Sequence, residues 1–171
     1  LQMWLAQRVR LNALYRPPRW KEIEALLNRG RSRSGAMFWP ARPSGIRALF
    51  KALKAGEAVG VLPDQSPPSE GVFVPFFGRD AKTMTLFGKL AERTSAPVVI
   101  GWAERLERGQ GYRLHWRRVT EPVGDADPAV AAAALNREIE EVVRACPEQY
   151  QWTYRRFSRR PEGWVNPYEC S

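Results

Sequence analysis

The chain has 171 residues, 44% of them hydrophobic, with 14 prolines and 13 glycines, which suits one ordered domain with a core and excludes a disordered tail. Its formal net charge of +9 indicates an anionic partner, either nucleic acid, an anionic membrane surface or a phosphorylated substrate. The two cysteines, Cys146 and Cys170, offer neither a metal-binding spacing nor a disulfide framework.

The first part of the chain predicts alternating helices and strands. Leu1 to Arg8 is predicted to be the end of a helix, and Leu11 to Tyr15 a strand that leads into a proline turn. Lys21 to Asn28 is predicted to be the next helix.

A stronger helix signal follows Ser44. Ser44 is predicted to cap this helix at its N-terminus, and Gly56 is placed to close it. One buried face is predicted from four apolar residues at helical spacing: Ile46, Leu49, Phe50 and Leu53.

The segment from Gly56 to Gly78 has the composition of a binding site. Ala58 to Leu62 is a short apolar run that predicts an interior strand. Asp64 and Gln65 follow directly at its end, where open α/β sheets bind their ligands. A Pro/Ser-rich loop then leads to a second apolar strand, Val72 to Phe77.

The next segments predict a crossover and a hairpin. A helix over Thr83 to Ser95 between the strands Val72 to Phe77 and Pro97 to Trp102 implies a right-handed crossover. Trp102 to Leu106 and Tyr112 to Val119 flank a glycine-containing connection and predict an antiparallel hairpin.

The last predicted helix begins at the cap pair Asp127-Pro128 and ends at Pro147. Its alanine-rich start predicts close packing, and its apolar face is formed by Val130, Leu135, Ile139, Val142 and Val143. These elements predict a single α/β domain over residues 1–171, with a mixed, mostly parallel sheet flanked by helices. No apolar run approaches the roughly 20 residues that span a membrane.

Basic residues concentrate in two places. Arg29, Arg31 and Arg33 alternate around Gly30. The second cluster combines arginines with aromatic residues: Arg155, Arg156, Arg159 and Arg160 with Trp152, Tyr154, Phe157 and Trp164. Neither place matches a nucleic-acid-binding motif, so a nucleic-acid partner is not expected. The second cluster fits either a bilayer surface or a packed helix with a solvated basic face.

Five motifs follow one another along the chain: Tyr15-Arg16-Pro17, Arg31-Ser32-Arg33-Ser34, Pro63-Asp64-Gln65, Phe73-Val74-Pro75-Phe76-Phe77-Gly78, and Pro147-Glu148-Gln149-Tyr150-Gln151-Trp152 running into Arg155-Arg156-Phe157. In this order the chain resembles the lipid A biosynthesis acyltransferases over nearly its whole length. The resemblance implies a glycerolipid acyltransferase-like fold. It also implies fatty acyl transfer from an acyl carrier protein thioester to a hydroxyl of a phosphorylated lipid A precursor, in lipopolysaccharide biosynthesis, without a cofactor.

The chain departs from that family at the general base. The family uses a His followed five positions later by Asp or Glu, whereas His115 is the only histidine here and Thr120 stands five positions on. Alternation in this segment favours a partly exposed strand position for His115. We therefore expect no catalytic residue in this chain, which would be the C-terminal part of a longer, N-terminally truncated domain and inactive alone. Its base and a membrane anchor at the cytoplasmic face of the inner membrane would lie upstream of Leu1.

The resemblance and the charge suggest substrate-binding residues. Arg31 and Arg33 are expected to bind phosphate, since arginine offers planar bidentate donors, although both fit solvated arginines. Asp64 either orients one of those arginines or accepts a hydrogen bond from the sugar. Gln65 suits a sugar hydroxyl or a turn cap. Further candidates are Arg79, Thr83, Arg155 and Arg156.

Two of these assignments have structural alternatives. Thr83 and Thr85 are expected to open a helix, where free N–H groups meet an anion or the threonine is a simple cap. Phe73, Phe76 and Phe77 fit either the core or a groove for the acyl chain.

Two other functions stay open. One is an acyltransferase for another lipid acceptor, such as a lysophospholipid or a glycosylated phosphoinositide. The other is a non-catalytic basic module that binds anionic lipid or nucleic acid.

Overall fold

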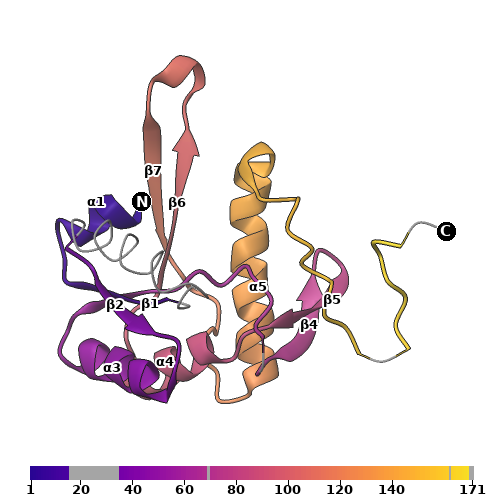
Figure 1. Cartoon of the computed structure of the whole chain (residues 1–171), viewed down its shortest axis with the longest axis horizontal. Coiled ribbons are helices and arrows are strands. Elements are labelled where there is room, and N and C mark those ends of the chain that lie inside the picture. Colours follow the sequence, from indigo (N-terminus) through magenta and orange to yellow (C-terminus); the bar gives the residue numbers. More distant parts are fainter. Residues whose placement is uncertain (16–34, 69, 162, 170–171) are drawn as a thin grey trace, which may run out of the picture. The chain divides into compact units, whose positions relative to one another are not determined.

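The computed structural model describes residues 1–15, 35–68, 70–161 and 163–169 (Figure 1). It confirms a mixed α/β class, in which helices accompany one parallel and two antiparallel sheets. The chain divides into two compact units, Leu1–Val61 and Leu62–Ser171. The predicted helix Lys21 to Asn28 and the predicted phosphate-binding residues Arg31 and Arg33 lie outside the described residues.

The first unit contains a three-stranded parallel sheet in the order β2-β1-β3. Its strands are β1 (Leu11–Tyr15), β2 (Met37–Pro40) and β3 (Ala58–Gly60), and a short helix α1 (Gln2–Ala6) precedes them. The predicted strand at Leu11–Tyr15 is confirmed as the central one. The predicted strand from Ala58 is shorter than expected, because its pairing with β1 ends at Gly60.

Helix α3 (Pro43–Lys54) packs on all three strands of this sheet and buries Leu49 completely. Its N-cap is Arg42, and no side chain caps it, so the prediction that Ser44 is the cap is wrong. The physical reason is Pro43, whose fixed φ and missing N–H suit the first helical position and start the helix earlier.

The predicted end of this helix at Gly56 is confirmed. Gly56 has a φ of 76°, and its N–H donates to the Leu53 carbonyl over 3.0 Å. The following Glu57 N–H donates to the Ala52 carbonyl over 2.9 Å. This pair of bonds is a Schellman motif, which needs a left-handed residue where glycine stands.

The second unit begins with a hairpin of β4 (Val72–Phe76) and β5 (Arg79–Thr83). Phe77 and Gly78 form its two-residue turn with φ values of 48° and 76°. Two positive φ values match the twist of a tight hairpin. The sequence predicted β4 but not β5, because only one of the two turn positions carries a glycine.

Helix α4 (Leu86–Thr94) follows the hairpin. The prediction that a helix starts at Thr83 is wrong, since Thr83 is the last residue of β5 and pairs with Val72. The strand β6 (Val99–Arg105) pairs with β7 (Tyr112–Arg118), and the predicted hairpin is confirmed. The predicted crossover is wrong, because β4 and β6 belong to different sheets. Apolar periodicity locates a strand but does not identify its partner.

Helix α5 (Pro128–Ala145) provides most of the core of this unit. The predicted cap is confirmed, since the Asp127 carboxylate accepts a hydrogen bond from the Ala129 N–H over 2.8 Å. The close packing of its start is also confirmed: a Cβ added at Gly88 in α4 would lie 3.0 Å from Ala131 Cβ. The core cluster consists of Phe76, Ala81, Val123, Ala134, Leu135, Ile139 and Val143.

A short helical turn, η2 (Pro147–Gln149), leads into an irregular C-terminal segment. The arginine-rich residues 155–160 belong to turns and not to a helix. Within the part of the chain that the structure describes, no helix combines the length and apolar character needed to cross a bilayer.

Candidate substrate-binding site

The C-terminal segment 150–160 lies against two other parts of the second unit. The Ser66 N–H donates to the Tyr154 hydroxyl over 2.9 Å, and Arg159 Nη1 donates to the Pro68 carbonyl over 3.0 Å. These bonds hold the loop that carries Asp64 and Gln65 beside segment 150–160. Residues from separate sequence motifs are therefore brought together.

The same segment is fixed to β5 by Arg156. Its Nη1 donates to the Lys82 carbonyl over 2.6 Å, and its Nη2 donates to Thr83 Oγ1 over 2.9 Å. Arg156 is only 3% exposed, and its guanidinium carbon lies 5.4 Å from the centre of the Phe76 ring. Burial lowers the pKa of this guanidinium, and the nearby Tyr150, Tyr154 and Asp64 oppose that shift. Arg156 thus joins the C-terminal segment to the core.

Thr83 lies at the centre of a buried polar network. Its hydroxyl donates to the Ala81 carbonyl over 3.0 Å and accepts from Asn136 Nδ2 over 3.0 Å. Asn136, in α5, also donates to the Pro75 carbonyl over 2.8 Å. Both side chains have 0% exposure. Thr83 therefore bonds to strand, helix and Arg156, and its predicted place at an anion-binding helix start is wrong.

Asp64 is half-buried in a bend, and Gln65 beside it is exposed. Burial raises the pKa of Tyr150, and the charge of Asp64 adds to this shift. Asp64 makes no ion pair with any residue that the structure describes. Arg31 and Arg33, which Asp64 was predicted to orient, lie outside those residues. The two predicted roles of Asp64, to orient one of these arginines or to accept a hydrogen bond from the sugar, therefore stay open.

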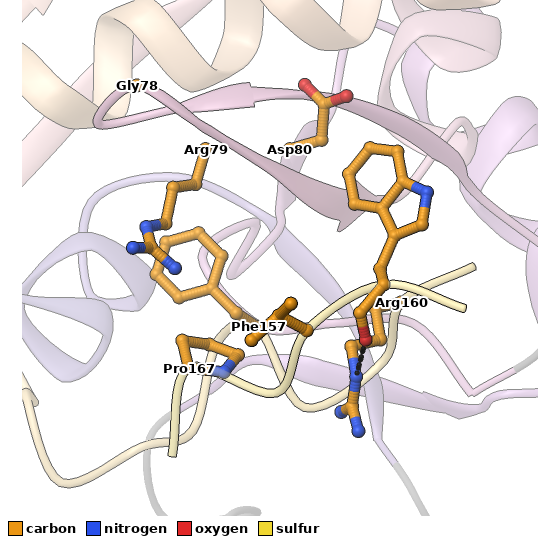
Figure 2. A pocket seen from close by; sticks show the side chains of 8 residues that line it. Gly78, Arg79, Asp80, Phe157, Arg160 and Pro167 are labelled. Carbon is orange, nitrogen blue, oxygen red and sulfur yellow. Dashed lines mark hydrogen bonds between the residues drawn. The ribbon is translucent and has the colours of Figure 1, made fainter. Parts of the chain in front are cut away.

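A hollow of about 350 Å³, here called the tail hollow, lies between the β4–β5 turn and the C-terminal residues (Figure 2). Arg79 and Asp80 contribute from β5, and Arg160 contributes from the C-terminal segment. Figure 2 shows the Asp80 carboxylate pointing away from the Arg79 guanidinium. The other lining residues are Gly78, Phe157, Trp164, Val165 and Pro167.

A second hollow of about 630 Å³, here called the strand hollow, shares Arg160 and Trp164 with the first. It is also lined by Phe73, Lys82, Ser158, Arg159, Pro161 and Gly163. Arg160 is held in place because its Nε donates to the Trp164 carbonyl over 3.0 Å and its Nη1 donates to the Ser158 carbonyl over 3.3 Å. Arg160 and Trp164 thus separate two basic, partly aromatic hollows.

The three phenylalanines predicted for core or groove have different surroundings. Phe76 is 2% exposed and belongs to the core cluster. Phe77 is 36% exposed at the hairpin turn, where its ring lies 6.2 Å from Trp152 and 5.1 Å from the Arg144 guanidinium carbon. Phe73 is half-buried and lines the strand hollow.

Arg155 and Arg156 have opposite environments although they are neighbours in sequence. Arg155 is exposed, and its guanidinium carbon lies 5.6 Å from the centre of the Tyr168 ring. Only Arg155 of this pair presents its charge to solvent, so only Arg155 is placed to meet a ligand directly.

His115 occupies the half-exposed strand position that alternation predicted. Its Nε2 lies 2.7 Å from Glu104 Oε2 across the β6–β7 hairpin, and its ring stacks on Trp102 at 4.7 Å. It lines neither hollow. No group of three or more histidine, cysteine or acidic side chains in the described ranges is arranged to hold a metal ion.

Three residues that line the hollows were not predicted as site residues: Lys82, Arg160 and Trp164. Arg160 and Trp164 belong to the basic and aromatic cluster that the sequence does show, so a signal was present. Both hollows also need residues of strand β5, which was not predicted. The sequence therefore did not indicate which residues the basic and aromatic cluster lies against.

Comparison with known proteins identifies the family of this chain. The family model described as bacterial lipid A biosynthesis acyltransferase matches residues 2–159. The lipid A biosynthesis lauroyltransferase of Escherichia coli (strain K12) is 36% identical over 154 residues, covering 88% of this chain and 49% of the relative. The palmitoleoyltransferase of the same strain is 35% identical over 153 residues, covering 88% and 49%.

A lipid A biosynthesis acyltransferase of Haemophilus influenzae is 32% identical over 155 residues, covering 90% of this chain and 48% of the relative. The chain thus spans about half the length of the curated relatives it matches. The match covers all the candidate site residues up to Arg156. The chain belongs to the bacterial lipid A biosynthesis acyltransferase family.

Proposed function

We propose that this chain forms the acceptor-binding part of an enzyme that moves a fatty acyl group from an acyl carrier protein thioester to a hydroxyl of a phosphorylated lipid A precursor. One observation carries the proposal. In a member of this family, segment 150–160 is hydrogen-bonded both to the loop that carries Asp64 and to strand β5, and residues of β5 and of this segment line two basic hollows.

The proposed reaction needs few groups from this chain. The acceptor oxygen attacks the thioester carbonyl carbon, an ester C–O bond forms, and the C–S bond breaks to release the thiol of the carrier. The hydroxyl proton passes to a general base, which this chain does not contain by our interpretation of His115. The residues present bind and orient the acceptor, which lowers the entropic part of the barrier.

Each site residue has a proposed role. Arg79 and Arg155 are exposed and supply fixed positive charge for phosphate oxygens, as do Arg31 and Arg33. Asp64 and Gln65 bond the sugar hydroxyls. Arg156 and Thr83 are buried, and their hydrogen bond holds the C-terminal segment against β5. Phe73 and Phe77 offer apolar surface to an acyl chain, and Phe76 of the core packs against Phe77.

Membrane association is part of the proposal. Trp152 is 59% exposed and Trp164 50% exposed, and both lie near arginines in sequence. Tryptophan and arginine together suit the interface of an anionic bilayer. The enzyme would act at the cytoplasmic face of the inner membrane, where acyl carrier protein delivers its thioester.

The test compares the 171-residue chain with a chimera. In the chimera, this chain replaces the segment of the Escherichia coli lauroyltransferase that it matches. We expect acyl transfer from acyl carrier protein to a radiolabelled lipid A precursor by the chimera and none by the chain alone, because the chain lacks the base. A folded chimera that binds the precursor but never acylates it would favour the non-catalytic binding module. Acylation of a lysophospholipid only would favour the other acceptor class.

A further inference from the structure

The tail hollow and the strand hollow share one wall. Arg160 and Trp164 form this wall, with Arg79 on one side and Lys82 and Arg159 on the other. Among the described residues that line the two hollows, Asp80 is the one acid. Four are cationic: Arg79, Lys82, Arg159 and Arg160. The described residues that line the two hollows therefore carry a net positive charge.

The arginines of this wall are not neutralised by the surrounding protein. No carboxylate in the part of the chain that the structure describes forms an ion pair with Arg79, Arg159 or Arg160. Arg160 is nevertheless oriented, since backbone carbonyls accept from its Nε and Nη1. Its Nη2 has no acceptor among those residues and remains available for a ligand. A guanidinium fixed in this way is preorganised for a phosphate oxygen.

The tail hollow also has an apolar part. Trp164 is 50% exposed and Val165 87% exposed, and Phe157 and Pro167 line the same hollow. A free inorganic anion gains nothing from these side chains. An amphiphile gains from both parts, because its phosphate meets the arginines while its hydrocarbon covers the apolar residues.

We infer that Arg160, Arg79 and Trp164 form a recognition site for a phosphate monoester carried by a lipid. This inference rests on the proposed function, since it names the part of the acceptor that the chain recognises. In this site the arginines bind the phosphate, and Trp164 and Val165 contact the adjoining hydrocarbon.

The test measures binding by calorimetry, with no acyl transfer involved, on the 171-residue chain. Three probes separate the sources of the phosphate: short-chain dioctanoyl phosphatidic acid, dioctanoylglycerol and inorganic phosphate. We expect phosphatidic acid to bind at least about tenfold more tightly than either other probe. Arg160→Gln and Arg79→Gln should each weaken its binding about tenfold, and Trp164→Ala should bring its affinity close to that of inorganic phosphate.

The matched control is Arg47→Gln, which removes the same charge from an exposed position of α3 and should change the affinity less than about twofold. The Arg79 side chain makes no hydrogen bond to any described residue, so Arg79→Gln tests the site even if Arg160→Gln fails to fold. Equal binding of phosphatidic acid and dioctanoylglycerol would overturn the inference, as would unchanged binding by both arginine variants. Equal binding of phosphatidic acid and inorganic phosphate would overturn the lipid part. The binding measurements do not depend on acyl transfer by the chimera, so a failure of this inference can be told apart from a failure of the proposed function.

Discussion

Arg156 Nη2 donates a hydrogen bond to Thr83 Oγ1 over 2.9 Å, and both side chains are almost completely buried. Thr83 also accepts from Asn136, so one hydroxyl joins the C-terminal segment, the end of β5 and helix α5. This bond sets the position of the strand that carries Arg79 and Lys82, although neither partner has to touch substrate.

Thr83→Val keeps the side-chain shape and removes the hydroxyl. We expect a loss of about 1–3 kcal/mol in the free energy of unfolding, because buried donors of Arg156 and Asn136 lose their acceptor. Thr153→Val is the control, since Thr153 is exposed, and it should change stability by less than about 0.5 kcal/mol. Urea unfolding of both variants measures the difference. Equal unfolding midpoints for Thr83→Val and Thr153→Val would show that the buried network contributes nothing to stability.

The buried Glu138 depends on Arg117. Arg117 Nη2 lies 2.7 Å from Glu138 Oε2 and 2.9 Å from Glu141 Oε2, and the Glu138 side chain is 2% exposed. Burial raises the pKa of Glu138, and the charge of Arg117 opposes this shift. Arg117→Ala should destabilise the protein by about 1–3 kcal/mol, because a buried carboxylate loses its partner while Arg117 itself is partly exposed.

Arg137→Ala is the matched control for this prediction. Its partner is Glu121, and the two side chains are 53% and 36% exposed, whereas Glu138 is 2% exposed, so the removal of Arg137 should cost about 1 kcal/mol or less. Thermal unfolding at neutral pH compares the two variants. If Arg137→Ala is the more destabilising, burial does not decide the strength of these ion pairs.

Glu104 predicts a pH dependence of stability. The hydrogen bond with His115 and the charge of Arg113 lower the pKa of Glu104 from its ordinary value of 4.5. A carboxyl group with a lowered folded pKa stabilises the protein fully above its unfolded pKa, and this stabilisation is lost as pH falls through the folded pKa.

Below pH 4.5 the wild type should therefore lose stability more steeply than Glu104→Gln. The melting temperature measured between about pH 3 and 6 tests this, with Glu107→Gln at the exposed hairpin tip as control. Parallel curves for wild type and Glu104→Gln would contradict the prediction.

Gly45 is required by the close approach of α3 to β2. A Cβ added there would lie 2.1 Å from the Pro40 carbonyl oxygen and 3.2 Å from Leu14 Cδ2. Gly45→Ala should therefore destabilise the first unit by about 1–3 kcal/mol or more, since backbone must move to make room. Ser44→Ala at the neighbouring exposed position should be nearly neutral, because the Ser44 side chain makes no cap bond. Chemical unfolding of both variants is the measurement, and equal stabilities would contradict the predicted clash.

The elements predicted most accurately from sequence are those with local signals. Helix α5 has a cap pair at Asp127-Pro128, helix α3 has Gly56 at its end, and the β6–β7 hairpin has glycines in its connection. The β4–β5 hairpin lacks such a signal, because Phe77 occupies a left-handed position that non-glycine residues rarely adopt. Missing that turn also placed the helix start three residues too early, at Thr83.

The residues of the candidate site were likewise predicted only as far as local sequence signals allow. The resemblance and the charge suggested Asp64, Arg79 and the arginines near the C-terminus as candidates. They did not distinguish Arg155, which is exposed, from Arg156, which is buried. Segment 150–160 has no helical or strand period from which a buried face can be deduced. Its orientation depends on tertiary bonds to Lys82, Thr83 and Ser66.

Acyl transfer by the chimera with Asp64→Ala tests the central claim most directly. If the Asp64 loop and segment 150–160 form the acceptor site, transfer to the lipid A precursor should fall by about tenfold or more while the protein remains folded. Glu70→Ala is the control, because its ion pair with Lys89 is exposed, and it should leave the rate unchanged. Transfer at the unmodified rate by a folded Asp64→Ala chimera would contradict the proposed site.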